Sequence, residues 1–156
     1  MYKRQALSGA EIGRINDLRL GEAILLGCET LHRQPIDGLH TDAITLCAEV
    51  IEAKLKPSMP LGTIAQNAFG EVPPVTDRGL VTQAILAVGQ QDVDPSGLQA
   101  PNGMHVMGAS SDHLILESGR FELKVGAEVI FQVNYGALVR AMTSPFVIKV
   151  MEPALV

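Results

Sequence analysis

Turn-forming residues divide most of this sequence into short apolar stretches, and this division limits the possible folds more than any other feature. Pro, Gly, Asp and Asn gather at places such as 94–97 and 101–103, where they favour turns. The stretches between them are rich in β-branched residues, which favour strands. The expected strands are residues 42–56, 80–88, 104–107, 113–117, 128–133 and 146–151. The pattern predicts a mainly β protein with an antiparallel sheet or a small β-barrel.

Two other segments carry a clear structural signal. The apolar residues 23–26 lie between two glycines and predict a buried strand followed by a turn. Residues 136–142 predict a short helix, because their apolar side chains share one face and Pro145 prevents its continuation. With 156 residues and 47% hydrophobic residues, the chain can bury a core of its own.

The charge and the apolar runs argue against several classes of partner. The formal net charge is -5 and the basic residues are scattered, so we expect no binding to nucleic acid or to an acidic membrane surface. The longest apolar runs, such as 84–88, are far shorter than the roughly 20 residues that span a bilayer. The first residues do not resemble a signal peptide. These features favour a cytoplasmic protein.

The metal-ligating residue types show no motif. The four histidines have neither the spacing of a zinc site nor a neighbouring CxxC pair, so we expect no metal. Cys28 and Cys47 are set among apolar residues without disulfide-type spacing, which predicts reduced, buried thiols. No P-loop and no glycine-rich dinucleotide motif is present.

Polar residues gather in three clusters, at 89–94, 108–113 and 134–145. The first follows the most apolar expected strand, and the second lies between two expected strands, so either could place side chains in a cleft. The third surrounds the expected helix with hydroxyl and amide groups that suit a phosphate. Each cluster also has a purely local explanation, as a turn or as the end of a helix. The residues alone leave both explanations open.

Together with residues 15–27, these clusters resemble, in order and spacing, the C-terminal half of the alanine-racemase-like family, which comprises pyridoxal-phosphate-dependent amino-acid racemases of fold type III. The ornithine racemase branch is the most similar. Members of this family have an N-terminal (β/α)8 barrel that holds the cofactor on a lysine, followed by a β domain, and their active site forms between two subunits. The resemblance implies that residues 1–30 are the last strand and helix of that barrel and that residues 31–156 are the β domain.

The resemblance also implies cofactor contacts. Arg19 matches the arginine that hydrogen-bonds the pyridine nitrogen and so makes the cofactor a weaker electron sink, which favours racemisation. Gly21 and Glu22 match the phosphate contacts that follow this arginine. Thr143 falls near the position that binds the phosphate from the far end of the chain.

The catalytic residues depart from the family pattern. Alanine racemases carry a tyrosine, their second base, where this chain has Gln90, and an amide cannot abstract a proton from the α-carbon. Asp92 is then the first candidate for the second base or for a contact to the ammonium group of the substrate, with Asp94, Asp112 and His113 behind it. Ser111 and His113, with Gln90, match the wall that the β domain lends to the site of the partner subunit.

The cofactor lysine has no match in this chain. None of its lysines stands in the family motif; they are Lys3, Lys54, Lys56, Lys124 and Lys149. We therefore expect part of a homodimeric isomerase that inverts the α-carbon of an amino acid and is inactive without the barrel. The alternative is a stand-alone β-barrel module that binds a partner or a small ligand and catalyses nothing.

Overall fold

A computed structural model of the chain describes residues 13–14, 17, 20–63, 66, 76–119 and 121–151. The chain divides into two compact units, Met1–Thr45 and Leu46–Val156. No helix in the described part is long and apolar enough to cross a membrane.

The first unit contains a short helix, α2 (Glu22–Leu26), where the sequence predicted a buried strand. That prediction was wrong, because a run of apolar residues this short suits one turn of helix as well as a strand. Gly27 ends the helix with a left-handed backbone (φ 63°). A Cβ atom at Gly27 would lie 2.2 Å from the carbonyl oxygen of His40, so the position also needs glycine for space.

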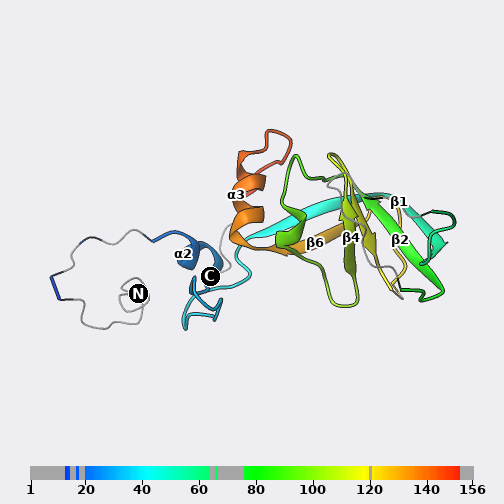
Figure 1. The fold of residues 1–156 in the computed structure, drawn as a ribbon. Coiled ribbons are helices and arrows are strands. Elements are labelled where there is room, and N and C mark those ends of the chain that lie inside the picture. The colour runs from blue at the N-terminus through cyan, green and yellow to red at the C-terminus, as the bar shows by residue number, and fades with distance from the viewer. Residues whose placement is uncertain are drawn as a thin grey trace. The chain divides into compact units, whose positions relative to one another are not determined.

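The second unit is a six-stranded antiparallel sheet that curls into a nearly closed barrel, which confirms the mainly β prediction (Figure 1). The strand order is β3-β6-β1-β2-β5-β4. The strands are β1 (Thr45–Pro57), β2 (Leu80–Leu86), β3 (Leu98–Gln99), β4 (His105–Ala109), β5 (Leu114–Glu117) and β6 (Glu128–Val133).

Side chains along the strands point alternately into and out of the barrel, and the inward-pointing ones form the core. In the first half of β1, Leu46, Ala48 and Val50 are buried while the residues between them are exposed, as expected when successive side chains point to opposite faces. Completely buried side chains from three further strands meet Val50 in the core; they are Leu86, Leu114, Leu116 and Phe131. An irregularity after Val50 shifts the register with β2, which bends the long strand around the barrel.

The same alternation corrects the expectation for one cysteine. Both cysteines are free thiols, but Cys47 points outward from β1 and is exposed, and Cys28 is only half-buried. The remaining desolvation at Cys47 raises the pKa of its thiol, and a hydrogen bond and the negative charge of Glu128 raise it further. The prediction of buried thiols was therefore wrong.

Two differences from the predicted strands concern the end of the chain and the edge of the sheet. Residues 146–151 were expected to form a strand, but they pair with no other strand in the described part of the chain. Only Val147 among them packs against the core. The edge strand β3 was not predicted, because its two residues are too few to show an alternating pattern.

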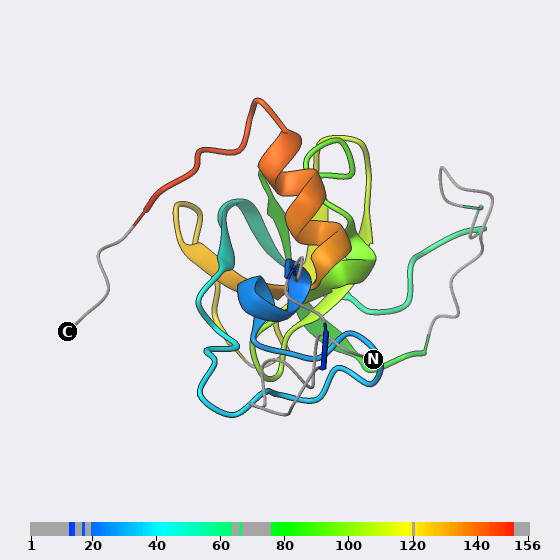
Figure 2. The same cartoon turned by 90° about the vertical axis from the view of Figure 1, so that its left-hand side faces the viewer.

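The helix predicted at 136–142 is confirmed as α3 (Tyr135–Thr143). It lies beside the single turn η1 (Pro95–Gly97), as Figure 2 shows. Asn134 begins the helix, since its side-chain oxygen accepts a hydrogen bond of 2.9 Å from the amide of Ala137. The amide of Asn134 in turn donates to the carbonyl oxygen of Gly97 over 2.8 Å. These bonds attach the start of α3 to η1.

Candidate functional site

The turn that follows β2, at residues 89–93, packs against the turn between β4 and β5. The amide of Gln90 donates a hydrogen bond of 2.9 Å to the carbonyl oxygen of Ser110, and the amide of Gln91 donates one of 3.0 Å to that of Ser111. Gly89 permits this approach, because a Cβ atom there would lie 2.3 Å from the Ser111 oxygen. The polar clusters at 89–94 and 108–113 therefore form one continuous surface.

The cluster at 134–145 joins this surface through a buried hydrogen bond. The Ser144 hydroxyl donates to Oδ1 of Asp92 over 2.7 Å. The two residues are 5% and 6% exposed, respectively. The Ser144 hydroxyl oxygen also accepts a hydrogen bond of 3.1 Å from the amide of Phe146. All three clusters that carried the family resemblance thus meet at one end of the barrel.

Asp112 has very different surroundings from Asp92. Its Oδ2 accepts a hydrogen bond of 2.7 Å from the Ser111 hydroxyl, and both residues are exposed. The adjacent His113 is exposed too, and its amide donates to the Ser110 hydroxyl oxygen over 3.1 Å. Of these two carboxylates, only that of Asp112 is open to a ligand from solvent.

Ser110 and His113 border a hollow of about 300 Å³ on the outer face of the barrel. It is also lined by Glu52 and by three isoleucines from adjacent strands, Ile51, Ile85 and Ile115. Ile85 and Ile115 lie opposite each other in the register of β2 and β5. The hollow thus combines apolar and polar lining residues, a combination common in ligand sites.

Thr143 is exposed at the end of α3, and its hydroxyl is directed to the helix backbone. Oγ1 lies 3.1 Å from the carbonyl oxygen of Val139 and 3.0 Å from that of Arg140. A hydroxyl has a single hydrogen to donate. Contact with a phosphate would therefore require the Thr143 hydroxyl to rotate away from the helix.

Of the cofactor contacts expected near the start of the chain, Gly21 and Glu22 are described and Arg19 lies outside the described residues. Gly21 occupies the N-cap position of α2, and its carbonyl oxygen accepts hydrogen bonds from the amides of Ile24 and Leu25. The Glu22 carboxylate forms an ion pair with Arg33. This pair leaves the backbone of Glu22, rather than its side chain, for a contact to phosphate.

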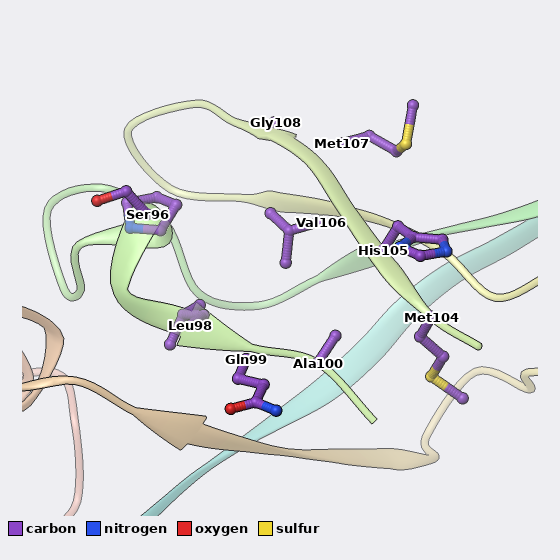
Figure 3. A pocket seen from close by; sticks show the side chains of 10 residues that line it. Ser96, Leu98, Gln99, Ala100, Met104, His105, Val106, Met107 and Gly108 are labelled. Atoms are coloured by element: carbon purple, nitrogen blue, oxygen red, sulfur yellow. The ribbon is translucent and has the colours of Figure 1, made fainter. Parts of the chain in front are cut away.

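A second recess, which sequence reasoning did not predict, lies between the unpaired edges of β3 and β4. It is an open groove of about 530 Å³. In Figure 3, Val106 points from β4 towards β3, whereas Met107 points away. Ser96, Gln99 and His105 supply polar groups along it. Within the residues that the structure describes, no group of three or more His, Cys, Asp or Glu side chains is placed to hold a metal ion.

Sequence reasoning identified the three clusters but did not single out Ser144. Its pattern of Thr, Ser and Pro after α3 is typical of a helix end. The partner, Asp92, is 52 residues away in the sequence. No local pattern relates two residues at that separation, so only the fold reveals the pair.

Comparison with known proteins shows that the chain is similar to two racemases. The chain is 45% identical over 153 residues to a lysine racemase from Thermotoga maritima and covers 43% of it. It is 42% identical over 138 residues to an ornithine racemase from Acetoanaerobium sticklandii and covers 39% of that protein. These matches include 96% and 86% of the present chain.

The chain thus spans about two fifths of the length of these relatives. No family model matches the sequence, and no solved structure gives a significant match. The similarity to both racemases supports the interpretation of this chain as a C-terminal fragment of an alanine-racemase-like protein.

Proposed function

We propose that this chain is the C-terminal β domain of a pyridoxal-phosphate-dependent racemase that inverts the α-carbon of a basic amino acid. In this proposal, residues 1–30 complete an N-terminal (β/α)8 barrel and residues 31–156 form the β domain. The longer protein works as a cytoplasmic homodimer, in which the β domain lends Gln90, Ser111 and His113 to the site of the partner subunit. The domain alone is inactive.

The observation that carries the proposal is the convergence of the resembling segments. Residues 89–93, 110–113 and 144 are far apart in the sequence but are joined by hydrogen bonds at one end of the barrel. The pairing of β2 with β5 brings the first two segments together, and the buried Ser144–Asp92 hydrogen bond adds the segment after α3 to them. The relatives named for lysine and ornithine, both of which carry a second amino group, support a basic substrate.

The donor groups of the chain fit the phosphate of the cofactor, although not the whole cofactor. Backbone N–H groups at Gly21 and Glu22 and the hydroxyl of Thr143 are the kinds of donor that bind a phosphate. Arg19 would hydrogen-bond the pyridine nitrogen, an assignment that comes from the family resemblance. The lysine that holds the cofactor comes from the part of the longer protein that this chain does not span. When bound, the cofactor withdraws electrons from the substrate α-carbon and so favours loss of its proton.

Racemisation needs a second group that exchanges a proton with the α-carbon on the face opposite the lysine. Gln90 cannot be this group, because an amide is not a base. In this proposal, the carboxylate of Asp112 returns or removes that proton. Its exposure, together with the hydrogen bond from Ser111 that orients it, supports this role.

The test is to express the longer reading frame that contains this chain, supply the cofactor and follow the chirality of L-lysine, L-ornithine and L-alanine by chiral chromatography. We expect the D-form of lysine or ornithine to accumulate faster than D-alanine. Asp112→Asn should lower kcat by about 10²- to 10⁴-fold, the usual contribution of an acid–base group. Asp94→Asn is the matched control, because the Asp94 side chain caps η1, a role that asparagine also fills. A folded protein that binds the cofactor and leaves all three amino acids unchanged would contradict the proposal.

The stand-alone binding module remains the second candidate, and the groove between β3 and β4 favours it. The barrel has a core of its own, and the groove of about 530 Å³ is large enough for a small ligand. If the longer reading frame does not exist, the binding module is the better description. Titration of the chain with pyridoxal phosphate, followed by absorbance, then gives no spectral change.

A further inference from the structure

Asp92 is held in a way that differs from every other carboxylate in the described part of the chain. Its bond to Ser144 is the one hydrogen bond there that joins two buried side chains. Burying a carboxylate is costly unless it is hydrogen-bonded. A buried carboxylate with a defined partner 52 residues away therefore indicates a tie between two segments rather than a reactive group that waits for substrate.

The turn that Asp92 belongs to is anchored on both sides. On one side, the amides of Gln90 and Gln91 donate to the carbonyl oxygens of residues 110 and 111. Within the turn, the amides of Asp92 and Val93 both donate to the carbonyl oxygen of Gly89 over 3.0 Å. On the other side, the carboxylate of Asp92 accepts the bond from Ser144. The two glutamines lie between these anchors.

We propose that Asp92 is a positioning residue, which holds Gln90 and Gln91 beside Asp112 by tying their turn to Ser144. This inference rests on the proposed racemase function. Gln90 is half-buried and Gln91 is exposed, so both can present an amide to the site. A base, in contrast, must come within hydrogen-bond distance of the proton that it removes, and the Asp92 carboxylate is buried with one oxygen already bonded. Asp112 is then the carboxylate that remains for proton transfer.

Asp92→Asn separates the two roles, because asparagine keeps the oxygen that accepts the Ser144 hydrogen bond but is not a base. For a positioning role, we expect D92N to keep kcat and its pH profile within about threefold of the unmodified enzyme, well below the 10²- to 10⁴-fold of an acid–base group. Asp92→Leu and Ser144→Ala remove the tie and should lower kcat by about 10- to 100-fold, as misplaced catalytic groups do.

Ser118→Ala is the control, because it removes a buried serine hydroxyl without affecting the Ser144–Asp92 hydrogen bond. Ser118 is completely buried, and its hydroxyl donates to the carbonyl oxygen of Phe121 over 2.6 Å. It follows β5 at the end opposite His113. Measured below the unfolding temperature of both variants, S144A should lose activity while S118A keeps it. Hydrogen exchange at the amides of Gln90 and Gln91 should accelerate in S144A and D92L and stay slow in D92N.

Two results would overturn the positioning role while leaving the proposed function intact. In the first, the unmodified enzyme is active, and D92N is folded but as inactive as D92L, which would make Asp92 a base. In the second, S144A keeps the kcat, the KM and the amide exchange of the unmodified protein. An unmodified enzyme that racemises nothing would instead remove the proposed function, and the positioning role with it.

Discussion

At the end of the barrel, two backbone segments approach so closely that one position between them can be occupied only by glycine. Gly89 lies against the backbone of residues 111 and 112, and a Cβ atom there would come within 2.5 Å of three of its atoms. The contact involves backbone on the opposite side, so no side chain can rotate to make room. The site surface therefore depends on a glycine that makes no chemical contribution itself.

Gly89→Ala should destabilise the chain by about 1–3 kcal/mol, the usual cost of inserting a methyl group into a tightly packed place. Gly108→Ala is the matched control, because a Cβ atom at Gly108 would meet nothing within 4 Å. We expect the control to change the free energy of unfolding by less than about 0.5 kcal/mol. Urea denaturation measures both. Equal stability of the two variants would show that the backbones separate easily.

At the scale of elements, the sequence predicted an element correctly where all the residues that stabilise it lie within or next to that element. The helix α3 has an N-cap, a buried face and a proline after its end, and its prediction was correct to within a residue at each end. Residues 146–151 have the alternation of a strand but no partner strand in the described part of the chain. A strand exists only by pairing, so alternation alone could not decide this segment.

Substitution of the N-cap residue tests how much α3 contributes to the stability of the chain. Asn134→Ala removes the acceptor for the amide of Ala137 and should lower the free energy of unfolding by about 1 kcal/mol. Asn134→Asp keeps a side-chain oxygen in the same place and should be close to the unmodified chain. Thermal unfolding followed by circular dichroism compares the two. A larger loss in the aspartate variant than in the alanine variant would contradict the capping role.

At the scale of the whole molecule, α3 carries apolar side chains on its exposed side as well as on its buried side. Ala137, Leu138 and Ala141 are buried, whereas Tyr135, Val139 and Met142, which are spaced by four and three residues, are 41%, 44% and 55% exposed. The segment after α3 adds further exposed apolar side chains, namely Phe146, Ile148, Val150 and Met151. A gathering of exposed apolar side chains is typical of an interaction site.

We therefore expect this chain, taken alone, to self-associate as its concentration rises. Val139→Lys and Met142→Lys should each shift the population towards monomer, because a charged group resists burial between two copies. Arg140→Gln is the control, since Arg140 is an exposed polar residue on the same helix. Sedimentation velocity over a range of concentrations provides the measurement. Association that is equally strong in all the variants would locate the contact elsewhere.

The sequence by itself determined the mainly β class, the helix α3, the three polar clusters and the likeness to a racemase family. Each of these depends on residue types, short spacings or the order of motifs, all of which can be seen along the chain. Only the tertiary structure decided that the clusters meet, that Asp92 is buried against Ser144 while Asp112 is exposed, and that Cys47 faces outward. The physical reason is that burial and hydrogen bonding depend on which strands become neighbours when the sheet curls, and sequence separation does not encode that neighbourhood.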